Sequence, residues 1–235
     1  MLPLGDGLGD RHVMVDEELL RRLCDYAQVS GEDTVLEIGA GTGNLTEALL
    51  ERGCRVVAVE KDARFYDYLA QAFKGEGKLT LLGGDAVKIR LPAFNKVVSN
   101  MPYSISRKIT ERLLGEDFTV AVLVYQREFA QKLAARPGAV NYRFISVLAQ
   151  SACKIEVLED IPPEAFRPKP KVRSCAVKLS PGKKLGEDYV VFLKNLFNHK
   201  NKKIRNILDE APAEYAEKKP VEMSSAEFSR LHSLI

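Results

Sequence analysis

The tetrapeptide Asn100-Met-Pro-Tyr103 combines residue types suited to chemistry on an aromatic amine. The amide oxygen of Asn100 and the main-chain carbonyl of Met101 can both accept hydrogen bonds from one amino group, and Pro102 fixes the backbone that carries this carbonyl. Tyr103 offers a ring on which a base can stack, a contact worth about 1–3 kcal/mol. The exocyclic amine of adenine is a poor nucleophile, so holding it in line with a methyl donor supplies much of the catalysis. The alternative is an ordinary proline turn that ends a strand.

A glycine-rich loop, Glu37-Ile-Gly39-Ala-Gly41-Thr-Gly43, follows an apolar run and precedes a helical pattern. Glycines permit a tight strand-to-helix turn and let the backbone approach a ligand closely. A dinucleotide-binding fingerprint would have its last glycine where Asn44 stands, so this spacing differs from it. The acidic Glu37 also disfavours a pyrophosphate. It suits a cationic ligand, such as one that carries an amino-acid ammonium group.

Two later acids fit the same ligand. Glu60 ends the next apolar run, where a carboxylate can accept both hydroxyls of a ribose, and Asp85 can accept an adenine amine. Each acid alone is more often a surface carboxylate, but three of them at successive strand ends predict a cofactor that carries a nucleoside. The residues that we assign to cofactor binding are His12, Met14, Glu37, Gly39, Gly41, Gly43, Glu60, Lys61, Asp85, Ala86 and Asn100.

The elements that position these residues follow from the apolar pattern. Short apolar runs alternate with segments of helical length, which predicts βαβ units; the runs are 35–38, 56–59, 79–82, 97–98 and 120–124. Two further runs, 155–158 and 172–179, are joined by about a dozen residues with four prolines, too few for a crossover helix. The sequence therefore predicts an α/β fold with about seven strands, mostly parallel with the last one antiparallel. A nicotinamide-binding domain would not be expected to end in this way.

The C-terminal part differs in composition from the rest. After Ser180-Pro-Gly182 the apolar pattern becomes helical, which predicts a catalytic domain over 1–180 and a small helical domain over 181–235. Between Arg167 and Arg205 there are twelve Lys or Arg residues against two acids, although the net charge of the whole chain is only +3. A basic segment beside an otherwise acidic chain indicates contact with a polyanion on one side; the alternative is a well-solvated basic surface.

Other classes of protein are disfavoured by composition. The four cysteines have no CxxC pair and the three histidines are scattered, so we expect buried thiols in a reducing compartment and no metal site. No apolar run approaches the roughly 18 residues of a membrane span, and the segment Met1–Asp6 lacks the features of a signal peptide. We therefore expect a cytoplasmic protein that does not contact a membrane.

Four motifs together resemble one known family in order and spacing. They are Glu37-x-Gly39-x-Gly41-x-Gly43, Asn100-Met-Pro-Tyr103, Tyr125-Gln-Arg-Glu-Phe-Ala130 and Phe166-Arg-Pro-Lys-Pro-Lys-Val-Arg-Ser174. The chain resembles the KsgA-like small-subunit rRNA adenine dimethyltransferases from about Asp10 to its end. This implies a class I methyltransferase fold that binds S-adenosylmethionine and releases S-adenosylhomocysteine. The implied reaction is N6-dimethylation of two adjacent adenines in the 3′-terminal hairpin loop of small-subunit rRNA, within a precursor of the small ribosomal subunit.

The resemblance also implies roles for single residues. Phe166 is expected to close over the flipped adenine opposite Tyr103, or else to be a core residue that anchors the hairpin. Gln126 and Glu128 resemble positions beside the active site. The family's N-terminal Gln-x-Phe-Leu element, which contacts the cofactor, stands here as Arg11-His-Val-Met14. Residues expected to contact rRNA are Arg167, Lys169, Lys171, His199, Lys200, Lys202, Lys203 and Arg205.

Several rival functions share parts of this pattern. Large-subunit rRNA adenine methyltransferases of the macrolide-resistance type have the same core motifs, and only the Phe166 hairpin and the C-terminal pattern favour the small subunit. DNA and protein-glutamine methyltransferases more often carry proline at position 101. A non-catalytic RNA-binding assembly factor or transcription factor on the same fold is disfavoured by the intact Asn100, Tyr103 and glycine loop. Nothing in the sequence demands more than a monomer.

Overall fold

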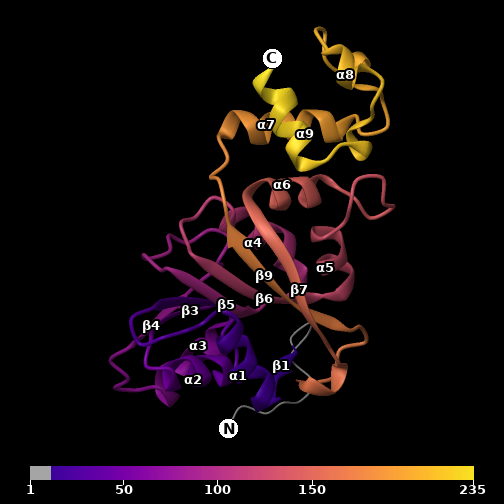
Figure 1. Cartoon of the computed structure of the whole chain (residues 1–235). Coiled ribbons are helices and arrows are strands. Elements are labelled where there is room, and N and C mark those ends of the chain that lie inside the picture. Colours follow the sequence, from indigo (N-terminus) through magenta and orange to yellow (C-terminus); the bar gives the residue numbers. More distant parts are fainter. Residues whose placement is uncertain (1–11) are drawn as a thin grey trace.

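A seven-stranded sheet forms the centre of the protein. The computed structural model describes residues 12–235, and Figure 1 shows the sheet with helices on both faces and further helices stacked at one end. The strand order is β4-β3-β2-β5-β6-β9-β7. The strands are β2 (Thr34–Ile38), β3 (Arg55–Glu60), β4 (Leu79–Gly83), β5 (Lys96–Asn100), β6 (Val120–Gln126), β7 (Cys153–Ile161) and β9 (Ser174–Pro181).

The predicted reversal at the end of the sheet is confirmed. Strands β2 to β6 pair in parallel, whereas β9 lies between β6 and β7 and is antiparallel to both. The proline-rich connection from Ile161 to Ser174 is too short for a crossover helix, so the chain can only turn back. The last strand begins at Ser174 rather than at the expected residue 172, because Val172 and Arg173 are exposed outside the ladder.

Helices cover both faces of this sheet, which is why its central strands are apolar at nearly every position. Helices α1 (Glu17–Tyr26), α2 (Asn44–Glu51) and α3 (Ala63–Ala72) contribute buried side chains to one apolar cluster. Helices α4 (Ser106–Leu113), α5 (Arg127–Leu133) and α6 (Phe144–Ala152) contribute to the other. The predicted cap of the first helix is confirmed, since the Asp16 side chain accepts a hydrogen bond from the Leu19 N–H.

Helices α7 (Glu187–Asn198) and α9 (Ser225–Ser233) pack on α6, and α8 (Ala213–Ala216) lies beyond them at the same end of the molecule (Figure 1). Leu193 of α7 and Phe228 of α9 belong to the same apolar cluster as the sheet. The buried hydroxyl of Tyr142 donates to the carbonyl of Met223 at 2.7 Å, which joins the two parts further. The domain boundary at residue 180 stays a prediction, although β9 ends beside it at Pro181.

One pairing is absent from the sequence-based prediction. Strand β1 (Val13–Met14) pairs antiparallel with β8 (Phe166–Arg167), so the start of the described chain lies on the connection between β7 and β9. Two residues are too few to show a periodic pattern, so the sequence carries no signal for this pair. All four cysteines are free and buried, as predicted. Within residues 12–235, no helix has the length and apolar character that a membrane span requires.

Candidate active site

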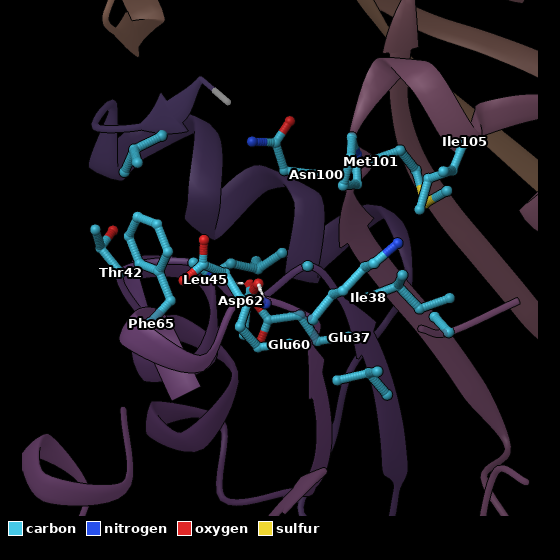
Figure 2. Close-up of a pocket in the computed structure, with 18 of the residues that line it drawn as sticks. Glu37, Ile38, Thr42, Leu45, Glu60, Asp62, Phe65, Asn100, Met101 and Ile105 are labelled. Carbon is cyan, nitrogen blue, oxygen red and sulfur yellow. Dashed lines mark hydrogen bonds between the residues drawn. The ribbon is translucent and has the colours of Figure 1, made fainter. Parts of the chain in front are cut away.

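A cavity of about 480 Å³ lies at the carboxyl ends of β2, β3 and β5. This is the edge at which open α/β sheets bind ligands, and the volume is in the usual range for small-molecule sites. Figure 2 shows Asn100 and Met101 on one side of the cavity and the carboxylates of Glu37 and Glu60 on another. The predicted site residues that line it are His12, Met14, Glu37, Gly39, Gly41, Glu60, Lys61, Asp85, Ala86, Asn100, Met101, Pro102 and Tyr103.

Two of the residues predicted to be catalytic or to bind the cofactor do not line this cavity. Gly43 caps α2 with a φ of 86°, and a Cβ there would lie 2.7 Å from Phe73 and 2.9 Å from Leu69. A glycine is therefore required at position 43 by the backbone conformation and by helix packing rather than by a ligand. Phe166 is fully buried in the apolar cluster of α1 and α2, with Met14 and Ala165. The expectation that its ring faces the adenine is wrong for this structure, because its pairing with Met14 places it in the core.

The glycine loop and the catalytic loop touch each other. Gly39 has a φ of 78°, and a Cβ on it would lie 3.0 Å from the ring of Pro102. The Gly41 N–H donates to Oε2 of Glu60 at 3.0 Å, and the Asp62 N–H donates to Oε1 of the same carboxylate at 2.8 Å. Glu60 therefore links the glycine loop after β2 to the residues that follow β3. The contact between Gly39 and Pro102 makes the glycine loop and the catalytic loop adjoining walls of one site.

A buried serine, which the sequence analysis did not single out, fixes these two loops. The hydroxyl of Ser99 donates to the Ile38 carbonyl at 2.7 Å and lies 3.3 Å from the Ile38 N–H, which donates back to it. Ser99 is fully buried on β5, one residue before Asn100. A serine directly after the apolar pair Val97-Val98 is the signal that could have identified it, because a hydroxyl buried in a strand needs a partner.

Glu37 is an acid held in an apolar setting. Its side chain is only 2% exposed, and its Oε2 accepts a hydrogen bond from the Thr46 hydroxyl at 2.6 Å. Burial raises the pKa of Glu37 to about 8; the Thr46 hydrogen bond opposes this shift and the charge of Glu60 adds to it. Without a ligand the side chain is therefore mainly protonated at neutral pH, and a nearby cation would favour its ionised form.

This raised pKa predicts a pH-dependent stability. The folded protein binds the Glu37 proton more tightly than the unfolded chain does, so the stabilisation is complete at low pH. It is lost as the pH rises from roughly 4.3, the ordinary value for Glu, to about 8. Glu37→Gln should lack this loss, so we expect the variant to gain a few kcal/mol relative to the wild type between pH 5 and pH 9. Urea unfolding of both ligand-free proteins measures this, and parallel pH curves would contradict it.

The third acid is paired. Nζ of Lys61 lies 3.2 Å from Oδ2 of Asp85, and the Val87 N–H donates to Oδ1 of Asp85 at 3.0 Å. The Val87 hydrogen bond, followed by that from Lys61, lowers the pKa of Asp85 and keeps it ionised. The cavity thus contains a protonated acid at the end of β2 and an ionised acid after β4, on the two sides of β3. This donor set fits a ligand with a cationic end and a nucleoside end, in agreement with the prediction.

The amide of Asn100 is held in one orientation. Its Nδ2 donates to the main-chain carbonyl of His12 at 2.9 Å. A carbonyl can only accept a hydrogen bond, so this contact requires the nitrogen on that side and leaves Oδ1 available to accept. His12 is itself fixed, since its Nδ1 lies 2.8 Å from the Pro168 carbonyl. The amide oxygen is thus the atom presented for an amine in the cavity.

Tyr103 is anchored through its hydroxyl. The hydroxyl lies 2.6 Å from Oγ of Ser174, a fully buried residue at the start of β9. Burial raises the pKa of Tyr103, so the phenol keeps its proton for this hydrogen bond. The Tyr103 ring lies beside His12, with 5.5 Å between the ring centroids. The ring is therefore set at a fixed place on the cavity wall.

This anchor predicts equal effects of two small changes. Ser174→Ala and Tyr103→Phe each remove one partner of the same hydrogen bond, so each should lower kcat/KM by a few-fold to about tenfold. The double variant should be no worse than either single variant, because each single change already removes the shared hydrogen bond. Steady-state kinetics with saturating cofactor checks this, and additive losses would show that the two hydroxyls act independently.

The predicted RNA-contacting residues lie in two places. Arg167, Lys169 and Lys171 are exposed on the connection between β7 and β9, which adjoins the cavity through the Pro168 carbonyl. In the C-terminal part His199 and Lys202 are exposed, whereas Lys203 and Arg205 both pair with Glu217. Their contact with RNA stays a prediction.

Comparison with known proteins agrees with this geometry. The family model for ribosomal RNA adenine dimethylase matches residues 10–226 of the chain. The chain belongs to the ribosomal RNA adenine dimethylase family. It is 37% identical to a probable ribosomal RNA small subunit methyltransferase A of Thermococcus onnurineus, over 97% of this chain and 91% of the relative. It is 42% identical to the Methanospirillum hungatei protein of the same name, over 85% and 80% of the two chains.

Two solved structures have the same fold as this chain. A dimethyladenosine transferase from Plasmodium falciparum superposes with a TM-score of 0.84 at 27% identity, covering 94% of this chain and 96% of the other. The 23S rRNA methyltransferase ErmE gives a TM-score of 0.74 at 23% identity, over 94% and 98% of the two chains. The second similarity supports the fold alone. The predicted class I methyltransferase architecture is thereby confirmed.

Proposed function

We propose that this chain dimethylates N6 of two adjacent adenines in the 3′-terminal hairpin loop of small-subunit rRNA, with S-adenosylmethionine as methyl donor. The observation that supports this most directly is the contact between its two key loops. Gly39 of the cofactor loop packs against Pro102 of the catalytic loop, so both loops face one cavity. The names of two relatives, 37% and 42% identical, favour the small subunit as substrate.

Each residue of the cavity has a separate task in this proposal. When bound, S-adenosylmethionine supplies an activated methyl group on a cationic sulfur. Glu37, Glu60 and Asp85 are placed to hold its polar and charged groups at three strand ends. Oδ1 of Asn100, oriented by the His12 carbonyl, accepts one N–H of the target amine, and the Met101 carbonyl accepts the other. The Tyr103 ring stacks on the base and fixes its plane.

This arrangement needs no side-chain general base. Two acceptors on one amine favour a pyramidal nitrogen whose lone pair points at the methyl donor, and alignment of two bound reactants supplies much of the catalysis. The target base must leave its RNA helix or loop stack to reach the cavity. The first transfer releases one amine proton to solvent, so the singly methylated amine has one N–H left and engages only one of the two acceptors in the second transfer.

The test is transfer of labelled methyl groups to separated small and large ribosomal subunits from cells that lack the modification, followed by nucleoside analysis. Dimethyladenosine in the small subunit alone is the expected result. Label in the large subunit would instead assign the chain to the resistance-type activity. A chain that neither transfers methyl groups nor melts at a higher temperature with S-adenosylmethionine would be a binding module, and the proposal would fail.

The C-terminal basic cluster should contribute to RNA affinity by pairing with phosphates. Replacing Lys200, Lys202 and Lys203 with Ala should weaken RNA binding and flatten its dependence on salt. The slope of the logarithm of the RNA association constant against the logarithm of the salt concentration should become shallower by roughly 0.7 to 0.9 for each phosphate that the variant no longer neutralises. A control variant with Arg55, Lys74 and Lys78 changed to Ala removes the same charge elsewhere. Arg55 begins β3, and the two lysines lie between α3 and β4. Equal salt slopes for the two variants would place the cluster away from the RNA.

A further inference from the structure

A second depression lies beside the catalytic loop, on the same edge of the sheet. It has a volume of about 350 Å³ and is lined by Gln126, Arg127, Glu128, Gln131, Val172 and Arg173. None of these residues lines the first cavity. Gln126 ends β6 and is the register partner of Ser174, which begins β9. No part of the proposed reaction uses this depression.

Only one residue separates the depression from the aromatic ring of the first site. The hydroxyl of Tyr103 lies 2.6 Å from Oγ of Ser174, and Arg173 directly precedes Ser174 in the chain. Neighbouring strands in a sheet lie about 5 Å apart, and Asn100, Gln126 and Ser174 stand at the ends of the adjacent strands β5, β6 and β9. A base stacked on Tyr103 therefore lies within about one nucleotide of the depression.

The charges in the depression suit an anion. The Arg127 N–H donates to the Arg173 carbonyl at 2.9 Å, which brings two arginines from separate elements to one place. The Arg173 guanidinium has no hydrogen bond or ion pair with any residue of the described range 12–235, and its charge acts only at longer range on the exposed Glu164, whose pKa it helps to lower. Arg127 has only a half-exposed pair with Asp160 at 3.4 Å, a kind of contact that contributes little. Glu128 is already paired with Lys132 at 2.7 Å.

The remaining lining residues suit a base and its sugar. Gln126 is half-buried and Gln131 is exposed, and both carry an amide that can donate and accept. Val172 is 45% exposed and offers an apolar surface between the amides and the arginines. Two guanidinium groups, two amides and an apolar patch together match the chemistry of a single nucleotide.

We propose that this depression binds the nucleotide next to the target adenine. The guanidinium groups of Arg127 and Arg173 hold its phosphate, and the amide of Gln126 contacts the edge of its base. This inference rests on the proposed function, because it presumes an RNA whose target adenine occupies the first cavity. In this proposal the enzyme recognises at least a dinucleotide. While one adenine reacts in the first cavity, the neighbouring nucleotide is bound in the depression.

The test combines kinetics with direct RNA binding. In the variant with both Arg127 and Arg173 changed to Ala, we expect KM for the RNA and the dissociation constant of the RNA complex to rise about tenfold or more. We expect kcat and the affinity for S-adenosylmethionine to stay within about twofold, because neither arginine lines the first cavity. Arg55→Ala is the control. Arg55 lies at the amino end of β3, away from the carboxyl ends that carry the site, so this change should leave all four quantities unchanged. Thermal unfolding of each variant checks that removal of the Asp160 pair has not unfolded it.

Base contact is tested with RNA hairpins in which the nucleotide on one side of the target adenine carries no base. On one of the two sides, removal of the base should weaken binding by the wild type but not by Gln126→Ala. Unchanged KM and RNA affinity in the double arginine variant would overturn the proposal even if the wild type methylates RNA normally. If the wild type methylates no RNA, the proposed function fails. If, in addition, the wild type and the double arginine variant bind RNA with equal affinity, the subsite is rejected as well.

Discussion

Changing Asn100 to Ala should reduce methyl transfer by orders of magnitude while leaving the affinity for S-adenosylmethionine nearly intact. Oδ1 of Asn100 is the amide atom left to face the cavity, because Nδ2 is taken by the His12 carbonyl at 2.9 Å. Without it the target amine lacks an acceptor that is needed when its nitrogen attacks. An interaction of this kind lowers kcat more than it lowers binding.

The measurement is single-turnover methyl transfer combined with calorimetric titration of the cofactor. Asn195→Ala, an exposed asparagine on α7, is the matched control and should behave as wild type. Unchanged turnover in Asn100→Ala would remove Asn100 from the mechanism. A large loss of cofactor affinity would mean that Asn100 acts mainly on the cofactor.

The second large effect concerns stability. Phe166 is fully buried and packs with Met14 and Ala165 in the apolar cluster of α1 and α2. Phe166→Ala should therefore lower the free energy of unfolding by about 3–5 kcal/mol, the usual cost of removing a buried aromatic ring. Phe166→Leu keeps most of the buried volume, so it should cost far less and retain turnover.

Tyr103→Leu provides the contrast, because Tyr103 lines the cavity and Phe166 does not. We expect Tyr103→Leu to lose turnover with a small loss of stability, and Phe166→Leu to retain turnover with a loss of stability well below that of Phe166→Ala. Urea unfolding and steady-state kinetics on the same preparations separate the two effects. If Phe166→Leu were stable and as inactive as Tyr103→Leu, the Phe166 ring would have to reach the base in the RNA complex.

The positions of the acids could be predicted because they depend on local sequence and one general rule. Glu37 is the next-to-last residue of β2, Glu60 is the last residue of β3 and Asp85 follows β4, and the carboxyl ends of parallel strands meet at one edge. The same reasoning placed Asn100 and Tyr103 beside them, where the structure has them. The antiparallel end of the sheet followed from the length and proline content of one connection.

The roles of Gly43 and Phe166 could not be predicted in the same way. A glycine that faces a ligand and one that makes room for a neighbouring helix have the same local signature. Gly43 is of the second kind only because Leu69 of α3 and Phe73, which caps α3, pack onto it. Phe166 is buried because β8 pairs with β1, a contact between residues about 150 positions apart.

The sequence by itself determined the fold class, the edge of the sheet that carries the site, and the chemical groups that the site contains. These depend on spacing along the chain and on the direction of parallel strands. Tertiary structure alone decided how the two catalytic side chains are held. Tyr103 is anchored to Ser174, 71 positions away, and Asn100 is oriented by His12, 88 positions away. Hydrogen bonds between such distant residues leave no periodic pattern in a single sequence, because they are set by where the packed elements meet.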